Sequence, residues 1–391
     1  MTGRDFAVIG GGPAGASAAR RLAAAGASVL VFERRPMPRP KPCGGALSAR
    51  AMAYLDFPLP DALVDVQVFG LRAHVGRMTA EARLDRRVAV LVTRARFDHY
   101  LVSMAQEAGA RVVWQPVRSL RVRPDAVVLA TPGGEHTAAC VVICEGANRR
   151  LGRAVCPPDA PDERLFALAA DVPAARPGPC AGQDGLLDIY HGVVDWGYGW
   201  VFHHGAYYSV GVAGLASRIS RPRETFARFV AERGLALDGV AVRGGFIPCG
   251  GVRRRRTADR LLLAGDAAGL ADPFQGEGLT YAIRSGQLAA DAALAAADRG
   301  DFSRRALAGY DQACRATFDR DLRHAWVLAR LLYRWPTPLL RGVTSEAEVL
   351  RRYLGITCGE STYGEFLRWF VPRALWRWTR ERLARVRRAS V

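Results

Sequence analysis

The run Phe6-Ala7-Val8-Ile9 leads directly into Gly10-Gly11-Gly12-Pro13-Ala14-Gly15, and an Ala-rich helical stretch follows. This order of strand, glycine turn and helix is typical of a dinucleotide-binding unit. Gly10 makes the tight turn, Gly12 lets the backbone approach a pyrophosphate, and Gly15 lets the helix pack on the strand. The phosphates would then meet the unpaired N–H groups and the positive dipole end of the helix. A glycine-rich turn without a ligand is the simpler alternative.

Two further segments point to the same nucleotide. The strand Ser28-Val29-Leu30-Val31-Phe32 ends at Glu33, at the separation expected for a carboxylate that binds a ribose hydroxyl. Far downstream, Gly265-Asp266-Ala267-Ala268-Gly269 follows the apolar run Leu261-Leu262-Leu263-Ala264. Each motif is weak alone, but together they predict that two distant segments close on one dinucleotide, FAD. The Asp266 carboxylate would accept hydrogen bonds from ribityl hydroxyls, and it can cap a helix at the same time.

Size and composition set further limits. A chain of 391 residues is long enough for two or three domains. No uncharged apolar run reaches the roughly 18 residues that a membrane-spanning helix needs, and the N-terminus leaves no room for a signal peptide before the first strand. We therefore expect a cytoplasmic protein, with a peripheral position on the inner face of the cell membrane as the alternative. The eight cysteines are scattered, without zinc spacing, so we expect no metal site.

The charge is strongly positive. The formal net charge is +18, and Lys41 is the only lysine, so the excess is almost all arginine. A GC-rich genome would produce the same bias without any functional demand. A positive field nevertheless favours anionic partners. Because the chain contains no nucleic-acid-binding motif, we expect a membrane surface or a phosphorylated substrate and no nucleic acid.

The pattern of apolar residues and turns predicts an α/β fold that is α+β overall. We expect a Rossmann-like FAD-binding domain interleaved with a mostly antiparallel substrate-domain sheet, and a helical C-terminal region. The predicted FAD-binding domain is discontinuous (1–70, 93–155 and 252–300). The substrate-binding domain takes 71–92 and 156–251, and the helical region takes 301–391.

Five motifs resemble those of the FAD-dependent geranylgeranyl reductase family, a branch of the para-hydroxybenzoate hydroxylase-like flavoproteins. The resemblance covers residues 5 to about 300. The motifs are Gly10-x-Gly12-x-x-Gly15 with Glu33, Lys41-Pro42-Cys43-Gly44-Gly45, Arg96-Phe97-Asp98, Tyr198-Gly199-Trp200-Val201-Phe202, and Gly265–Gly269 continuing to Pro273–Gly278. The chain departs from the family at His203, where the family has proline, and His204 follows it.

The resemblance implies a set of FAD contacts. Backbone N–H groups of the segment 273–278 would face the pyrimidine edge of the flavin, where negative charge grows on reduction. Arg96 would contact the FAD, although an arginine at a helix start is more often simply solvated. The complete predicted set is Gly10, Gly12, Ala14, Gly15, Glu33, Arg34, Arg96, Gly265, Asp266, Pro273, Gly276 and Gly278.

The resemblance also implies a catalytic loop and a substrate wall. Cys43, Gly44 and Gly45 lie in a loop that would reach the flavin face, where Cys43 is either a weak acid that donates a proton or a packed thiol. Tyr198, Trp200 and Phe202 alternate, so all three project from one face of a strand. Such a row is either ordinary core or the wall of a site for a long apolar chain.

The implied reaction is reduction of isolated C=C bonds in a prenyl chain carried by a lipid, quinone, pigment or prenyl diphosphate. The chain has no second Gly-x-Gly-x-x-Gly unit, so the donor would be transiently bound NAD(P)H or reduced ferredoxin. A flavin-dependent monooxygenase or halogenase on the same fold is one alternative. A non-catalytic flavin-containing lipid-binding protein is another.

The C-terminal segment predicts a basic amphipathic helix. After Pro372, which can open a helix, residues 373–388 contain seven arginines and one acidic residue. Leu375, Trp376 and Leu383 gather on one side at helical spacing, with most of the arginines opposite. This layout is typical of a helix that lies on an anionic membrane surface, and equally of one that packs on its own protein.

Overall fold

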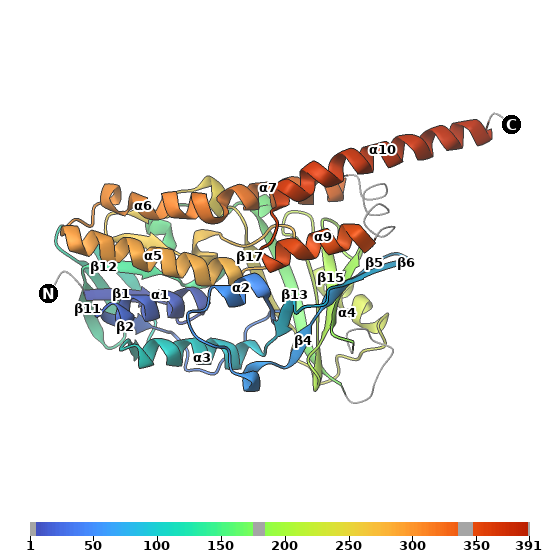
Figure 1. Cartoon of the computed structure of the whole chain (residues 1–391). Helices are drawn as coiled ribbons and strands as arrows, with labels where there is room; N and C mark the ends of the chain where they lie inside the picture. The colour runs from blue at the N-terminus through green and yellow to red at the C-terminus, as the bar shows by residue number, and fades with distance from the viewer. Residues whose placement is uncertain (1–4, 175–183, 335–346, 390–391) are drawn as a thin grey trace.

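The computed structural model describes residues 5–174, 184–334 and 347–389, with the side chains of 377, 378 and 381–389 left out. Cys180 and the far apolar residue of the C-terminal helix, Leu383, therefore lie outside what is described. A six-stranded sheet forms the half of the molecule that contains the glycine turn (Figure 1). Its strands, in spatial order, are β18 (Thr257–Ala258), β19 (Leu261–Leu263), β12 (Cys140–Ile143), β1 (Asp5–Ile9), β2 (Ser28–Phe32) and β8 (Arg111–Val113). Every neighbouring pair is parallel except β18 with β19.

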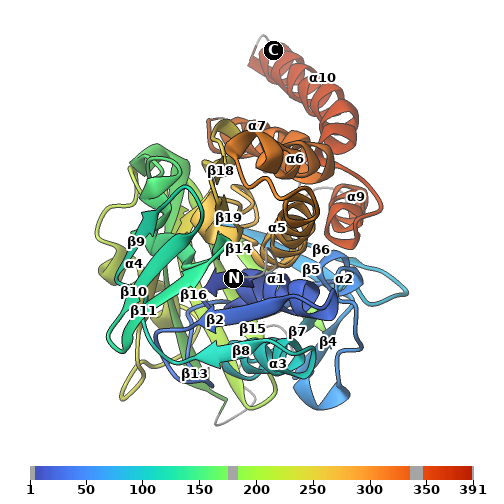
Figure 2. The ribbon, with the colours of Figure 1, turned by 90° about the vertical axis from the view of Figure 1, so that its left-hand side faces the viewer.

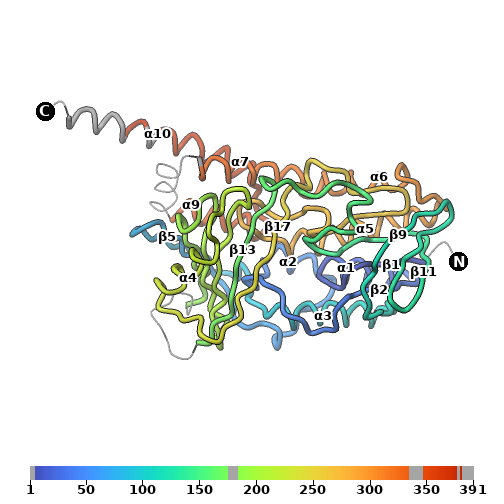
Figure 3. Tube along the Cα trace, turned by 180° about the vertical axis from the view of Figure 1, so that it is seen from behind, coloured from blue at the N-terminus to red at the C-terminus, as the bar shows by residue number. Residues whose placement is uncertain are grey.

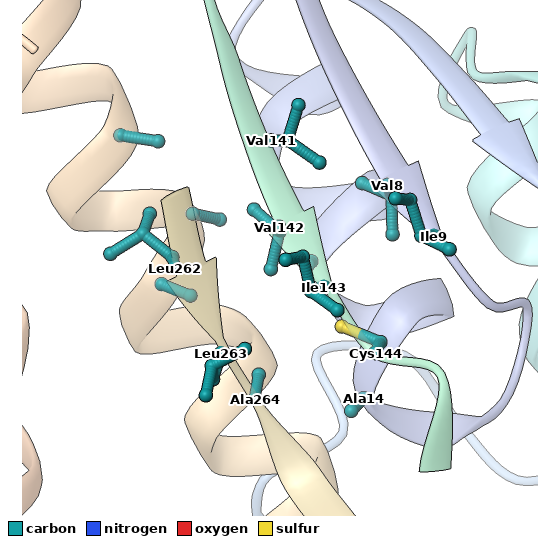
Figure 4. Close-up of a cluster of buried hydrophobic side chains, with 14 of the residues drawn as sticks. Val8, Ile9, Ala14, Val141, Val142, Ile143, Cys144, Leu262, Leu263 and Ala264 are labelled. Carbon is teal, nitrogen blue, oxygen red and sulfur yellow. The ribbon is translucent and has the colours of Figure 1, made fainter. Parts of the chain in front are cut away.

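Helices cover one face of this sheet, and a three-stranded antiparallel ribbon covers the other (Figure 2). The helices are α1 (Pro13–Ala24) and α5 (Leu279–Arg299), with α3 (Arg94–Glu107) beside α1. The ribbon consists of β9 (Ser119–Val122), β10 (Val127–Thr131) and β11 (Gly134–Ala138). Figure 4 shows the core where β1, β12 and β19 meet, and Val8, Val142 and Leu262 are fully buried there. Burial on both faces is the reason why these strands are continuous apolar runs.

A seven-stranded sheet forms the other half of the molecule, at the opposite end from α6 and the N-terminal strand (Figures 1 and 3). Its order is β17 (Arg243–Pro248), β13 (Arg164–Pro173), β16 (Tyr207–Leu215), β15 (Gly197–His203), β14 (Leu186–His191), β5 (Gly70–Val75) and β6 (Met78–Arg83). All neighbours are antiparallel except β14 with β5. Helix α4 (Pro222–Ala231) buries Phe226 and Phe229 against its outer face. The expected α/β fold with a mostly antiparallel second sheet is confirmed.

A small sheet joins the two halves. It consists of β3 (Ala46–Ser48), β7 (Ala89–Leu91) and β4 (Val66–Val68), and α2 (Ala49–Ala53) follows β3. The domain boundaries predicted from the sequence divide this sheet, because β7 lies in 71–92 while its partners lie in 1–70. The loop Cys43–Gly45 leads directly into β3, so the small sheet holds that loop between the halves.

Helices complete the chain. They are α6 (Arg304–Cys314), a π-turn at Arg315–Asp319, α7 (Arg320–Arg334), α9 (Ala347–Cys358) and α10 (Tyr363–Ala389). Helix α9 packs on β5 and β6, and α10 packs on α7 and α9. The expectation that Pro372 opens a helix is wrong, because Pro372 lies inside α10. Buried Tyr363, Phe366 and Phe370 anchor the first turns of α10, so the helix forms upstream and continues through a residue that lacks one N–H donor.

Beyond Pro372, α10 leaves the body of the protein (Figure 1). Leu375 and Trp376 are 58% and 59% exposed. Within the described residues, no helix combines the length and the apolar character needed to cross a membrane.

Candidate active site

One cavity of about 1010 Å³ lies between the two halves and below the C-terminal helices. Polar groups and glycines line one end, the Cys43–Gly45 loop and the segment 274–278 line the middle, and apolar side chains line the rest. The cavity therefore connects the glycine turn after β1 with the inner face of the seven-stranded sheet.

The glycine turn is shaped by close backbone contacts. A Cβ at Gly15 would lie 1.8 Å from the carbonyl oxygen of Gly10, and a Cβ at Gly10 would lie 2.3 Å from that of Cys144. Gly12 differs, because the nearest atom to a Cβ there is Arg39 Nη2 at 3.9 Å, so Gly12 faces open space in the cavity. Helix α1 starts after Gly12 without a side-chain cap, and Ala14 in its first turn lines the cavity. The turn thus presents a helix N-terminus to open space, which suits a phosphate group.

Glu33 lies at the same end, directly after β2. Its side chain is buried, and one carboxylate oxygen accepts from the N–H of Gly11 at 2.9 Å. The other oxygen accepts from the N–H of Arg35 at 3.1 Å, and Arg39 Nη2 lies 3.3 Å from the carboxylate. Glu33 and Arg34 line the cavity, so the carboxylate is held rigidly where the sequence predicts a ribose contact.

Asp266 lies beside the middle of the cavity, in the turn after β19. Its Oδ2 is 3.5 Å from Lys41 Nζ, and its Oδ1 would lie 3.3 Å from a Cβ at Gly278. Gly265, with φ of +60°, brings this turn close to Ala14 of α1. The two distant motifs thus meet across one cavity, as the sequence predicts for a single dinucleotide.

A buried carboxylate, Asp272, organises the turn that follows. Its Oδ1 accepts from the N–H groups of Phe274 and Gln275 at 2.7 and 2.8 Å, and its Oδ2 accepts from the hydroxyl of Tyr363 at 2.7 Å. Burial raises the pKa of Asp272 to about 6. The turn places residues 274–278 along the cavity opposite the Cys43–Gly45 loop. The Asp272 carboxylate and the carbonyl of the same residue, which accepts from the N–H of Gly276 at 2.9 Å, thus fix the shape of this turn, and Gly276 and Gly278 line the cavity.

These residues fit FAD. The fit rests on open space above Gly12, on an uncapped helix start beside it, and on carboxylates at the two positions where ribose and ribityl hydroxyls would need acceptors. FAD would lie with its pyrophosphate at α1, its adenosine end toward Glu33 and its flavin end toward the Cys43–Gly45 loop.

The Cys43–Gly45 loop is held from several sides. The hydroxyl of Ser209 donates to the carbonyl of Cys43 at 3.3 Å, and the N–H of Gly45 donates to the Cys43 sulfur at 3.4 Å. The guanidinium of Arg94 also interacts with this sulfur. Arg94 is buried and binds both oxygens of Asp98, at 2.9 and 3.1 Å. Burial opposes its charge, but Asp98 and Cys43 outweigh that effect and raise the pKa of Arg94 further. Cys43 therefore lines the cavity with two donors at its sulfur.

Tyr198, Trp200 and Phe202 form the wall behind this loop. All three line the cavity from the inner face of β15, as their alternation predicts. A Cβ at Gly44 would lie 2.7 Å from the Phe202 ring and 3.3 Å from Trp200 Nε1, so the loop lies against these rings. The hydroxyl of Tyr198 donates to the carbonyl of Gln275. The wall thus contacts both segments that border the flavin end of the site.

At the apolar end of the cavity, the sequence did not predict which other elements line the site. This end is lined from β5, β13 and β14 by small and aliphatic residues and by His191, and from α7, α9 and α10 by larger side chains. The C-terminal contributors include Leu328, Leu332, Leu350, Tyr353, Phe366 and Phe370. These helices are therefore part of the site and do not merely follow it in the chain.

Four of the predicted site residues do not line the cavity: Gly15, Arg96, Gly265 and Pro273. Gly15 and Gly265 act through close packing of the backbone. Arg96 points away, since its guanidinium donates to the carbonyl of Ala62 and lies 3.6 Å from Asp65. Arg94 lines the cavity instead. The sequence could have indicated this, because Arg94 precedes the buried residues Phe97 and Leu101 by three and seven positions. Residues at this spacing share one helix face, so Arg94 lies on the buried face of α3.

Comparisons with known proteins identify the family of the chain. The family described as FAD dependent oxidoreductase matches residues 5–55. A geranylgeranyl diphosphate reductase of Rhodobacter capsulatus is 32% identical over 74% of this chain and 75% of its own length. A digeranylgeranylglycerophospholipid reductase of Methanosphaerula palustris is 31% identical over 80% of this chain and 82% of its own.

A solved structure shares the fold as well. It is a geranylgeranyl bacteriochlorophyll reductase-like protein from Thermoplasma acidophilum, with a TM-score of 0.78 and 23% identity over 95% of this chain and 98% of that one. Two relatives above 30% identity match most of this chain, and the cavity contains the glycine turn and the carboxylates of Glu33 and Asp266. The chain belongs to the geranylgeranyl reductase family of FAD-dependent oxidoreductases.

Proposed function

We propose that the protein reduces isolated C=C bonds of a geranylgeranyl-type prenyl chain, carried by a lipid, quinone, pigment or prenyl diphosphate. The cavity carries this proposal, because its apolar region continues directly from the flavin end of the cofactor site. A chain without hydrogen-bonding groups fits walls of aliphatic and aromatic side chains. The names of the two relatives, which refer to geranylgeranyl substrates, support the same substrate class.

The reaction needs a hydride at one carbon and a proton at its neighbour. Bound FAD in its reduced form supplies the hydride. We assign the proton to the thiol of Cys43, which lines the cavity between the flavin end and the aromatic wall. When the proton leaves the sulfur, the N–H of Gly45 and the guanidinium of Arg94 stabilise the thiolate that remains. The thiolate then regains a proton before the next bond is reduced.

An unactivated alkene offers no electron sink, so the protein must orient the bond and exclude water. Tyr198, Trp200 and Phe202 would hold the chain against the flavin. Leu350 and Phe370 would cover it from the side of the C-terminal helices. Because these surfaces are apolar, they discriminate by length and branching of the chain rather than by hydrogen bonds.

The electron donor is, in this proposal, NAD(P)H or reduced ferredoxin. The net charge of +18 would attract either of these anionic molecules. Anaerobic mixing of the oxidised holoenzyme with each donor distinguishes them, since only the true donor bleaches the flavin absorbance rapidly.

We further propose that the protein works at an anionic membrane surface through α10. Leu375 and Trp376 are exposed, and Arg380 lies 4.6 Å from the ring centre of Trp376. An apolar pair with a neighbouring arginine suits the boundary between lipid chains and headgroups. Phe370, less than two turns earlier on the same helix, lines the cavity, so a lipid bound there would be close to the substrate region.

Mass spectrometry after anaerobic incubation with chemically reduced holoenzyme tests the reaction. The substrates are a geranylgeranyl diphosphate, a prenylated quinone and a diprenyl glycerophospholipid, and the oxidised enzyme is the control. We expect a gain of two hydrogens for each bond reduced in at least one substrate. If none changes while the flavin is fully reduced, the proposal is wrong.

Two further measurements, of O₂ consumption and of flavin reduction by each donor, separate the alternatives. A monooxygenase or halogenase would leave the prenyl substrates unchanged without oxygen and consume O₂ when substrate and reduced flavin are present together. A non-catalytic lipid-binding protein would retain FAD that neither donor reduces.

A further inference from the structure

His204 lies directly behind the Cys43–Gly45 loop, in the turn between β15 and β16. Its side chain is 1% exposed. Nδ1 lies 2.9 Å from Asp65 Oδ2, and Nε2 lies 3.1 Å from the carbonyl oxygen of Gly44. A Cβ at Gly45 would lie 2.8 Å from His204 Cε1, so the ring is in close contact with the loop backbone.

Both ring nitrogens of His204 face acceptors. A peptide carbonyl has no proton to give, so Nε2 must be the donor in its contact with Gly44. The hydroxyl of Tyr207 lies 3.1 Å from Nδ1, and the hydroxyl of Thr93 donates to Asp65 Oδ2 at 2.8 Å. Nε2 is therefore directed as a donor at the loop carbonyl, and Nδ1 is held by the Asp65 carboxylate and the Tyr207 hydroxyl.

The peptide that receives this N–H also contacts Cys43. The carbonyl of Gly44 and the N–H of Gly45 belong to the same peptide unit, and this N–H donates to the Cys43 sulfur at 3.4 Å. A donor at the carbonyl polarises the peptide and strengthens its N–H as a donor. Arg94 supplies the other donor at the sulfur from α3. The hydrogen bond from His204 is thus linked to the Cys43 sulfur through a single peptide group.

We propose that His204, held by Asp65, is a positioning residue that fixes the Gly44–Gly45 peptide and strengthens its hydrogen bond to the Cys43 sulfur. This inference rests on the proposed function for the catalytic purpose of Cys43, but the effect on the sulfur does not depend on the substrate. His204 directly follows His203, the position at which the chain departs from the proline of the family motif.

Several charged groups surround this arrangement. Asp65, Asp171, His203, Tyr207 and, through Asp65, Arg96 face His204. Arg94, paired with Asp98, faces the sulfur from the other side. Asp65 contacts His204 directly, whereas Asp171 and His203 act on it only through space, so Asp65 is the partner whose removal should matter.

The alkylation rate of Cys43 by iodoacetamide tests the proposal. The holoenzyme is treated near neutral pH, and each cysteine is followed by peptide mass spectrometry, with half-buried Cys358 as the internal reference. In His204→Asn the side chain is too short to reach the Gly44 carbonyl, so we expect Cys43 alkylation to slow by about tenfold, the size of one unit in thiol acidity. His204→Gln restores a donor at about the position of Nε2 and should recover most of the rate. Asp65→Asn should slow Cys43 alkylation by about threefold, because it weakens the support of His204 without removing its contact with Gly44.

His203→Asn is the matched control, because it changes the neighbouring imidazole and leaves the Gly44 contact intact. It should alkylate at the native rate. A loosened fold would raise alkylation at Cys43 and Cys358 together, which is the opposite of the expected change. A native or faster Cys43 rate in His204→Asn therefore overturns the proposal.

The outcome is separable from that of the proposed function. If Cys43 slows as expected but no prenyl substrate is reduced by the native protein, the proposed function fails and the role of His204 stands. If prenyl reduction occurs and His204→Asn alkylates normally, the reverse holds. Where both hold, His204→Asn should lower kcat and leave KM for the prenyl substrate nearly unchanged.

Discussion

A Cβ on Gly15 would lie 1.8 Å from the carbonyl oxygen of Gly10, whereas a Cβ on Gly12 would meet only Arg39 at 3.9 Å. Two glycines of one motif are thus needed for different reasons. Gly15→Ala should destabilise the fold by about 1–3 kcal/mol or more, because helix α1 must move away from the turn. Gly12→Val should fold with a near-native melting temperature and lose FAD, because its side chain occupies the space of the pyrophosphate.

Thermal unfolding and flavin absorbance of the purified variants check both expectations. Retention of stoichiometric FAD by Gly12→Val would contradict the placement of the pyrophosphate above that residue.

Asp266→Ala tests the second half of the cofactor site. The carboxylate lies in the cavity, with Lys41 at 3.5 Å, and its removal takes away the acceptor for ribityl hydroxyls. We expect FAD affinity to fall by at least tenfold, measured by equilibrium dialysis. Asp259→Ala, a change at an exposed acid after β18 that does not line the cavity, should bind FAD normally. Equal affinities in the two variants would exclude a role for Asp266.

Cys43→Ser and Cys43→Ala should lower turnover strongly while FAD content and melting temperature stay nearly native. The thiol lines the cavity, so its removal leaves the core intact but takes away the proposed acid. Serine is the sharper variant, because it keeps the size of the side chain and is a much weaker acid. Steady-state kinetics under anaerobic conditions decide the matter. Native turnover in both variants would show that Cys43 is a packed thiol without a catalytic role.

Asp272 should make stability depend on pH. Its pKa is raised by burial from 3.8 to about 6, so the folded protein binds this proton more tightly than the unfolded chain does. The native protein should therefore gain stability relative to Asp272→Asn as the pH falls from 7 to 4. A pKa difference of about two units between the folded and unfolded states corresponds to about 3 kcal/mol in the free energy of unfolding. Urea unfolding of both proteins at several pH values measures the difference.

Asp301 is a control, because its effect on stability should change with pH in the opposite direction. The N–H of Ser303 lowers its pKa, so the native protein should lose stability relative to Asp301→Asn as the pH falls. If Asp272→Asn and the native protein keep a constant difference between pH 7 and 4, the carboxylate is not buried as described.

The exposed residues of α10 should control binding to anionic vesicles. Leu375→Ser combined with Trp376→Ser should weaken co-sedimentation with phosphatidylglycerol-containing vesicles by about tenfold or more, from the loss of apolar burial. Binding by the native protein should weaken with salt, because the arginines contribute by charge. Trp114→Ser, at a 42% exposed tryptophan after β8, is the matched control. Equal binding by all three proteins would show that α10 is not the membrane contact.

Local sequence patterns were sufficient for the nucleotide-binding half. The apolar runs before Gly10 and Gly265 are buried parallel strands, and a strand buried on both faces needs little tertiary information to be recognised. The alternation of Tyr198, Trp200 and Phe202 was also sufficient to place their side chains on one face. The two-residue period of a strand is set by its backbone and does not depend on the rest of the fold.

Long-range packing decided what local patterns could not. Arg94 and Arg96 stand two residues apart on one helix, about 200° around its axis, so only the direction of the core selects the one that faces the cavity. The lining by α7, α9 and α10 depends on how these helices fold back over β5 and β6. The contact between Asp65 and His204 joins residues 139 positions apart, and no local pattern reports it.

The cofactor cradle is assembled from strands that begin at residue 5 and end at residue 263, and it is closed by Asp266 and by α5, which reaches residue 299. When only the first glycine turn has been synthesised, the Asp266 segment that faces it across the cavity does not yet exist. Synthesis must pass the whole seven-stranded sheet before β19 can join β12. Contacts of such high sequence separation are slow to form. The complete cradle therefore exists only after synthesis has passed residue 299.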